Sequence, residues 1–206
     1  MFNSKINVKM AKSNPAQILL KNVRFAYVHV FEKDELADKY TCRILVPKNT
    51  PQLGEIQAAI KAACTAGSAK LHGKEIPWTE VLHDGDAKTT KEGQSVHPGY
   101  WYLNAKSSNK PGVVKVNSSG IGGKTMEITD EAEFYSGCYG WADLGFFAFN
   151  QGVNYGISVG LNNVLKTGGE DGQGNGQYMG GRSSAESVFG AEIEADDLPG
   201  DNDDLC

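Results

Sequence analysis

Aromatic side chains crowd into one stretch of the sequence, residues 134–149, which holds seven of the nineteen aromatic residues of the chain. Successive side chains of a β-strand point to opposite faces. The rings at odd positions are Tyr135, Tyr139, Trp141, Phe147 and Phe149. The even positions are mostly small or apolar, so the pattern predicts a strand with one core face and one row of flat rings. Exposed rings can stack on nucleobases, which is worth roughly 1–3 kcal/mol per base.

The same stretch fits a second interpretation, in which both faces of the strand are buried and the rings fill a core. Phe146, at an even position, is predicted to lie in the core in either case. Gly137, Gly140 and Gly145 interrupt the row, which is typical of bulges or sharp curvature in a barrel strand. A bulge would exchange the two faces locally, so alternation alone leaves the exposure of each ring open.

Cations and polar groups accompany the rings on other predicted strands. In the strand predicted for residues 39–46, Lys39 and Arg43 share a basic face, which is either a phosphate contact or a solvated surface. One face of the strand predicted for residues 100–106 carries Tyr100, Tyr102, Asn104 and Lys106. Lys110 and Lys124 follow in loops. We expect the cations to contact phosphates and Asn104 to hydrogen-bond sugar or base.

Rings combined with cations on a β-surface predict binding of single-stranded nucleic acid, because a duplex hides the faces of its bases. Stacking tolerates every base, since each has a π-face, so binding without sequence preference is expected. Lysine and arginine add an electrostatic contribution by neutralising phosphates and releasing counterions. Carbohydrate-binding barrels also use exposed rings, and composition by itself does not separate the two classes.

Acidic and metal-binding patterns in the sequence suggest a competing chemistry. Asp84 and Asp86 flank Gly85, and with Asp143 they could hold a divalent ion in a nuclease. Asp-Gly-Asp is also common in turns, because both residue types favour the backbone angles that turns require. The four cysteines show no zinc-type spacing and the four histidines are dispersed. We therefore expect no metal, no cofactor and no enzymatic activity.

The expected elements point to a mostly-β fold. Strands are predicted for residues 21–31, 39–46, 100–106, 113–116, 134–149 and 154–164. A helix with an N-cap at Thr50, proline at its first position and a stop at Gly67 is expected to cover the sheet. Residues 71–97 form a long excursion. Short strands without βαβ alternation favour an OB-fold-like Greek-key barrel with one main helix.

Charge divides the 206-residue chain unevenly. The net charge is −5, yet eight acidic residues and no lysine or arginine follow residue 185, which leaves +3 for the rest. Seven glycines occur in residues 167–181. We expect an OB-type domain over residues 1–166, a flexible linker over 167–185 and a disordered acidic interaction tail over 186–206. Residues 1–14 lack the apolar core of a signal peptide and no run is long enough to span a bilayer, so a cytoplasmic location is expected.

Several short motifs, taken in order and spacing, resemble those of a known family. They are Asp84-Gly85-Asp86, Asn104-Ala105-Lys106-Ser107 with Lys110-Pro111, Tyr135-Ser136-Gly137-Cys138-Tyr139, and GISVGLNNV at 156–164. Over most of residues 20–206 the chain resembles the OB-fold single-stranded-DNA-binding proteins of tailed bacteriophages. The resemblance implies binding without sequence preference that supports phage DNA replication, recombination or repair in the host cytoplasm.

The end of the chain extends this resemblance. Asp196-Asp197-Leu198-Pro199 and Asp203-Asp204-Leu205-Cys206 are similar to the acidic, apolar-tipped tails of bacterial and phage single-strand binders. Such tails dock replication and repair proteins and can compete with DNA for the basic surface. The partner-binding residues implied here are Asp196, Asp197, Asp201, Asp203, Asp204 and Leu205. Such tails often finish in Phe, whereas this one finishes in Leu-Cys, so the partner stays open.

Two alternatives to DNA binding stay open at this point. One is the divalent-metal nuclease that would use Asp84 and Asp86. The other is a structural or assembly protein of the virion, in which the aromatic strand at 134–149 is a subunit interface. A homo-oligomer is compatible with each of these functions.

Overall fold

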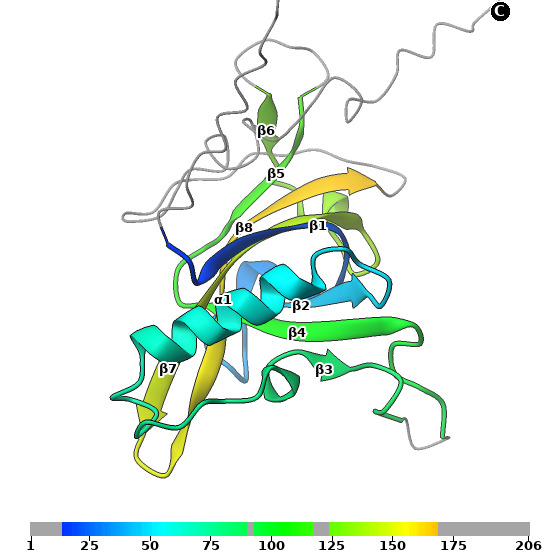
Figure 1. Cartoon of the computed structure of the whole chain (residues 1–206). Coiled ribbons are helices and arrows are strands. Elements are labelled where there is room, and N and C mark those ends of the chain that lie inside the picture. Colours follow the sequence, from blue (N-terminus) through cyan, green and yellow to red (C-terminus); the bar gives the residue numbers. More distant parts are fainter. Residues whose placement is uncertain (1–13, 90–92, 118–123, 169–206) are drawn as a thin grey trace, which may run out of the picture.

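The computed structural model describes residues 14–89, 93–117 and 124–168 (Figure 1). Within them the chain is mostly β-structure, as the sequence predicts. The strands are β1 (Gln17–Asp34), β2 (Lys39–Pro47), β3 (His83–Asp84), β4 (Tyr100–Ser107), β5 (Gly112–Val116), β6 (Thr125–Glu127), β7 (Tyr139–Gln151) and β8 (Asn154–Gly168). The helices are α1 (Leu53–Ala66) and the 3₁₀ turns η1 (Trp78–Glu80) and η2 (Glu131–Glu133). No helix in these residues is long and apolar enough to cross a membrane.

Five strands close into a barrel. β1 pairs antiparallel with β2 and β7, β2 pairs antiparallel with β4, and β7 pairs antiparallel with β8. A short parallel pairing of β4 with β8, at Ala105 opposite Val159, joins the two ends of the sheet. This order is the five-stranded Greek-key topology of an OB-fold, which confirms the predicted fold class. β3 extends the edge of β4, and the β5–β6 hairpin extends β8.

The core lies inside the barrel and under α1. On β7 the even-numbered residues Ala142, Leu144, Phe146 and Ala148 are all buried in the main apolar cluster. Ile56 and Ile60 of α1 join the same cluster, and α1 contacts β7, β1 and β8. The alternation read from the sequence therefore gives the correct core face of β7, and Phe146 lies in the core as predicted.

Two predicted boundaries are wrong for local reasons. The helix begins at Leu53 with Gln52 at the N-cap, because Thr50 Oγ1 instead accepts the Gln52 N–H at 3.2 Å in the preceding turn. β7 begins at Tyr139 and not at residue 134. The chain before it forms η2 and a turn, in which the Gly137 N–H donates to Phe25 O at 2.7 Å.

Trp141 is a correction to the predicted row of exposed rings. Its side chain is only 3 % exposed and packs with Val114 and Leu165, with Leu19 alongside, in a second apolar cluster outside the barrel. The β5–β6 hairpin continues the sheet beyond β8 and supplies Val114 to this cluster. The Trp141 side chain does point to the face of β7 that the alternation predicts. Another apolar layer covers that face at this point, so Trp141 belongs to a core.

Gly140 is required by a close approach of β7 to β8. A Cβ at this position would lie 1.8 Å from Leu165 O, and the carbonyl belongs to the sheet backbone and cannot rotate away. We expect Gly140→Ala to lower the free energy of unfolding by about 1–3 kcal/mol or more, measured by denaturant titration.

Gly54 is the matched control for this substitution. A Cβ there meets nothing within 4 Å, and helix α1 already surrounds the position. Gly54→Ala is expected to stabilise the protein by about 0.4–1 kcal/mol. Equal effects of the two substitutions would contradict the packing of β7 on β8.

Candidate nucleic-acid interface

The centre of the candidate site is Arg43, whose guanidinium lies between two tyrosine rings on the outer face of the barrel. Its Cζ is 4.6 Å from the ring centroid of Tyr27 and 4.6 Å from that of Tyr102. Arg43 Nε donates to Asn104 Oδ1 at 2.9 Å, and Nη1 lies 3.1 Å from His97 Nε2. A guanidinium held flat in this way keeps N–H groups available for phosphate oxygens.

Strand register brings these side chains together. Arg43 of β2 lies opposite Asn104 of β4 and opposite Ala26 of β1. The register of β1 against β2 shifts after Ala26, and Tyr27 has a positive φ of 50°, which marks a bulge. The bulge turns Tyr27 outward, where its side chain is 56 % exposed.

The excursion between β3 and β4 supplies His97. The turn at 97–100 packs against Gly85, where a Cβ would lie 2.4 Å from His97 O and 2.6 Å from Tyr100 O. Lys48 Nζ lies 2.6 Å from both Asp84 Oδ1 and Asp86 Oδ2, on either side of Gly85, and the Gly99 N–H of the turn donates to Asp86 Oδ1 at 3.0 Å. The Asp-Gly-Asp motif therefore anchors the excursion that places His97 beside Arg43.

The ion pairs of Lys48 with Asp84 and Asp86 also bear on the metal-nuclease alternative. The ammonium of Lys48 holds the pKa of the Asp84 and Asp86 carboxyl groups below the ordinary value and already neutralises much of their charge. Asp143 is buried in β7, where it accepts hydrogen bonds from Gln17 Nε2 at 2.8 Å and Asn163 Nδ2 at 2.9 Å. Among the described residues no group of three or more His, Cys, Asp or Glu side chains could hold a metal ion.

The histidines beside the tyrosine rings are held neutral. Burial and then the nearby charges of Arg43 and Lys88 lower the pKa of His97 below its ordinary value of 6.5. Burial also lowers the pKa of His83, whose ring centroid lies 5.0 Å from that of Tyr102. At neutral pH the His97 Nε2 therefore accepts the N–H of Arg43 and adds no positive charge of its own.

A second group of rings continues the site toward the start of β4. Arg24 Cζ lies 5.4 Å from the ring centroid of Tyr139, and Arg24 Nε donates to Gly137 O at 3.2 Å. Burial and the neighbouring Tyr139 phenol raise the pKa of Tyr100. Tyr139 is an exposed ring at an odd position of β7, as predicted.

A groove continues the site in the opposite direction. Phe147 and Phe149 of β7 line a cavity of about 430 Å³ together with Lys39 of β2 and Lys106 of β4. Phe147 is 48 % exposed, and Phe149 is half-buried. This arrangement brings together two predicted rings and two predicted cations from three different strands.

These groups form one continuous surface, here called the polar-aromatic track. Its residues are Arg24, Tyr27, Lys39, Arg43, Tyr100, Tyr102, Asn104, Lys106, Tyr139, Phe147 and Phe149. Tyr100, Tyr102, Asn104 and Lys106 alternate along β4 and span about 20 Å at the usual rise per strand residue. The track follows the face that oligonucleotides use on OB-folds, which is formed by the second and third barrel strands and the loops beside them.

Comparison with known proteins identifies the family of this chain. The sequence model of a family described as the ssDNA-binding protein of Enterobacter phage Enc34 matches residues 16–199. The chain belongs to this family. A family of ssDNA-binding proteins is not a class of enzyme, and the family supports neither the nuclease nor the virion-protein alternative. No curated protein matches the sequence.

Two solved structures of the Enc34 family protein have the same fold as this chain. The ssDNA-binding protein from bacteriophage Enc34 in complex with ssDNA is 20 % identical, with a TM-score of 0.60 over 76 % of this chain and 89 % of that chain. A second structure of the Enc34 protein is 21 % identical, with a TM-score of 0.57 over 84 % and 90 %. At this level of identity the likeness shows the fold.

Several predicted site residues of this Enc34-family chain lie away from the open part of the track. Tyr102 is only 6 % exposed, because Arg43, His83 and His97 cover its ring. Lys110 lies 5.6 Å from the ring centroid of Phe31, and the exposed Lys124 stands beside β6, whose pairing partner is β5. The predicted partner residues Asp196, Asp197, Asp201, Asp203, Asp204 and Leu205 lie outside the described residues.

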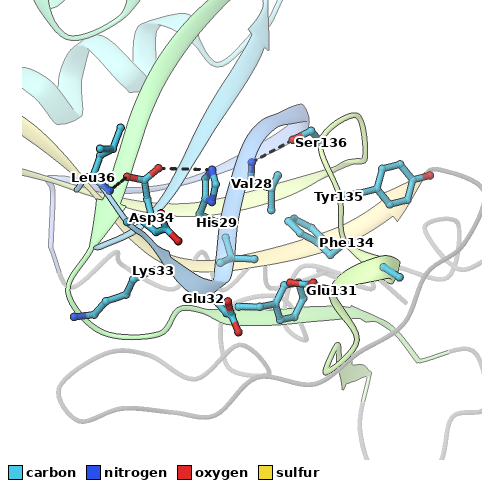
Figure 2. Close-up of a pocket in the computed structure, with 14 residues that line it drawn as sticks. Val28, His29, Glu32, Lys33, Asp34, Leu36, Glu131, Phe134, Tyr135 and Ser136 are labelled. Atoms are coloured by element: carbon cyan, nitrogen blue, oxygen red, sulfur yellow. Dashed lines mark hydrogen bonds and ion pairs between the residues drawn. The ribbon is translucent and has the colours of Figure 1, made fainter. Parts of the chain in front are cut away.

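Tyr135 lines a cavity that is separate from the groove at Phe147. This cavity, about 780 Å³, opens between the far end of β1 and residues 131–136. Figure 2 shows His29 and Asp34 on one side of it and Glu131, Phe134 and Tyr135 on the other. Its charged lining is mainly acidic, from Glu32, Asp34, Glu35 and Glu131. Such a lining repels phosphate, so the cavity is not a continuation of the track.

Two members of the track and the adjoining His97 were not predicted from the sequence of this family member. Tyr27 shares the parity of the core residue Phe25, so alternation would place it inside, and the bulge that reverses it has no glycine to announce it. Arg24 could have been predicted to face outward, because it lies between the apolar residues Val23 and Phe25, which are both buried. His97 lies in an irregular excursion, where the sequence has no periodicity from which its neighbours in space could be predicted.

Proposed function

We propose that this protein binds single-stranded DNA without sequence preference along the polar-aromatic track, and thereby supports phage DNA replication, recombination or repair. The observation that carries the proposal is the Arg43 guanidinium fixed between Tyr27 and Tyr102, on a face continuous with the groove of Phe147 and Lys106. Membership in a family of ssDNA-binding proteins supports it. Because that family comes from bacteriophages, we propose the host-cell cytoplasm as the place of action.

The proposal gives each part of the track a physical role. Tyr27, Tyr139, Phe147 and Phe149 offer partly open ring faces, on which successive bases stack. Arg24, Lys39, Arg43 and Lys106 neutralise phosphates. Tyr100 adds a ring edge beside Tyr139, and Asn104 orients Arg43 through its 2.9 Å hydrogen bond. Tyr102 serves as the floor that keeps the Arg43 guanidinium flat.

The direct test is a comparison of oligothymidine with duplex DNA of equal length across a salt series, read by fluorescence anisotropy of labelled DNA. We expect tight binding of the single strand and much weaker binding of the duplex. Four phosphate contacts predict a slope of log K against log salt of about −3 for the single strand. Equal affinity for both forms, or no binding at low salt, would overturn the proposal.

A pH series tests the role of His97, which lies beside Arg43 of the track. The pKa of His97 is depressed in the free protein, and a neighbouring phosphate favours the protonated ring, so DNA binding takes up a proton. Affinity for oligothymidine is expected to rise as the pH falls from 7.5 to 5.5, by up to about tenfold for each pKa unit that DNA restores.

His97→Gln is the matched variant for this series, because it keeps a polar side chain but cannot become charged. The variant should show a flat pH profile over the same range. Asp84 and Asp86 stay ionised throughout, since Lys48 holds their pKa values below the ordinary value. A pH profile that is the same in both proteins would exclude His97 as the source.

We further propose that an acidic tail over residues 186–206, joined by a linker over 167–185 to a domain over 1–166, recruits replication or recombination proteins. The tail lies outside the described residues; its charge and its resemblance to tails of other single-strand binders support the proposal. β8 continues to Gly168, so the barrel and the proposed linker overlap at two residues.

Deleting residues 186–206 tests the tail. The deletion removes eight negative charges that compete with phosphate for the track, so the affinity for oligothymidine at low salt should rise. The gain should vanish at high salt, where the competition is screened. Replication proteins captured by the full chain should no longer bind the shortened one. An affinity unchanged at low salt would remove the competition.

A further inference from the structure

We propose that the cavity between residues 28–36 and 131–136, here called the acidic cavity, is a docking site for a second copy of this protein. The second copy inserts its N-terminal segment, residues 1–13, as an added strand. No residue that lines the acidic cavity belongs to the polar-aromatic track, so this contact goes beyond DNA binding. Three observations carry the inference: an unpaired strand edge, the lining of the cavity, and the composition of the segment.

One edge of β1 has no partner strand beside the acidic cavity. β1 pairs with β7 only as far as Arg24, and its backbone hydrogen bonds to the chain before β7 end at Phe25. The Val28 N–H then donates to a side chain, Ser136 Oγ, at 3.2 Å. Within the described parts of the chain, β1 pairs only with β2 over residues 29–34, and its second edge pairs with no strand. An open edge of this kind is a template for a strand from another chain.

Exposed apolar side chains flank this edge. Leu36, in the turn after β1, is fully exposed, and Tyr135, on the other side of the acidic cavity, is 40 % exposed (Figure 2). The volume of the cavity, about 780 Å³, is within the range of ligand sites. Covering both side chains with an added strand would remove apolar surface from water, which favours docking.

The charges that line the acidic cavity are unbalanced. Glu32, Glu35 and Glu131 line it, and none of them forms an ion pair with another described residue. The lining also contains Lys33, whose Nζ lies 2.9 Å from Asp38 Oδ1 and is neutralised there. The cavity therefore attracts a segment that carries positive charge as well as apolar side chains.

The N-terminal segment has this complementary composition. Residues 1–13 carry three lysines and no aspartate or glutamate, and they lie outside the described residues. Apolar residues alternate with polar ones in its middle part, which is the pattern of a strand with one apolar and one basic face. The apolar members are Ile6, Val8 and Met10, and the polar members are Lys5, Asn7 and Lys9. The acidic residues at 186–206 do not suit the cavity, because like charges repel.

Reach favours a neighbouring copy over the same molecule as the donor of the segment. Along β7, from Gly145 opposite Gln17 to Tyr139 near the lining residue Ser136, the distance is about 20 Å at the usual rise per residue. The seven residue steps from Met10 to Gln17 span at most about 25 Å. Within one molecule the connection would be almost fully extended merely to bring Met10 to the rim. A second copy docks without this constraint.

Complementary charge reversals in the full chain test the docking by sedimentation velocity without DNA. Glu32→Lys with Glu35→Lys makes the cavity basic, and Lys5→Glu with Lys9→Glu makes the segment acidic. We expect the wild-type protein to self-associate as its concentration rises, and each double variant to associate at least about tenfold more weakly, because like charges then meet. An equimolar mixture of the two double variants should regain the wild-type affinity, since each segment again meets a cavity of opposite charge.

Glu75→Lys with Glu80→Lys is the matched control, because it makes the same change of charge at exposed residues outside the cavity and should leave association unchanged. Circular dichroism checks that every variant is folded. A wild-type protein that stays monomeric, or double variants that associate like it, would overturn the proposal. A mixture that stays monomeric would also overturn it, because the segment then does not dock in a second copy. Since no DNA is present, none of these outcomes affects the proposed function.

Discussion

Replacing Arg43 with alanine is expected to lower the affinity for oligothymidine by about 10- to 100-fold. The substitution removes a charge-assisted hydrogen bond to phosphate, worth about 1.5–3 kcal/mol. It also opens the space between Tyr27 and Tyr102, where the guanidinium lies 4.6 Å from each ring centroid. The slope of log K against log salt should become shallower by about 0.7, as for one lost phosphate contact.

Two further variants separate charge from geometry at Arg43. Arg43→Lys keeps the charge and should keep the salt slope, but it loses the planar contact with both rings and should recover only part of the affinity. Lys61→Met on α1 removes an exposed cation away from the track and should leave affinity unchanged. If Lys61→Met and Arg43→Ala weaken binding equally, the interaction is diffuse electrostatics and Arg43 is not its centre.

Trp141→Ala and Phe147→Ala are expected to have opposite effects, although both rings stand at odd positions of β7. Trp141 packs in the apolar cluster with Val114 and Leu165, so its loss should lower the free energy of unfolding by about 3–5 kcal/mol. Phe147 is half exposed, so its loss should leave stability within about 0.5 kcal/mol and weaken oligothymidine binding by about 1–3 kcal/mol. Denaturant titration and anisotropy measure the two quantities.

Trp141→Phe is a second variant that keeps the test valid if Trp141→Ala does not fold. It keeps most of the buried ring and should reduce stability less than the alanine variant does, with the affinity of the folded protein unchanged. Loss of affinity in Trp141→Phe without loss of stability would mean that this ring contacts DNA after all. Loss of stability in Phe147→Ala would assign Phe147 to the core and close the proposed groove.

Local regularities in the sequence were sufficient for the fold class and for much of the track. Tyr100, Tyr102, Asn104 and Lys106 share one face of β4, as their spacing predicts, because side chains alternate along any extended strand. The same rule placed Phe146 inside and left Tyr139 and Phe147 outside. Alternation is a property of the backbone and needs no knowledge of the neighbouring strands.

What lies over a strand face was decided only by the tertiary structure. Val114 of β5, which is distant in sequence, covers Trp141. His97 covers Tyr102 from an irregular excursion, where no strand periodicity predicts the contact. The sequence predicts the alternation of inward and outward side chains correctly on either side of Tyr27, but the bulge at Tyr27 reverses it there. A sequence thus determines which side chains share a face. Whether that face meets water or another layer depends on how the chain returns to it.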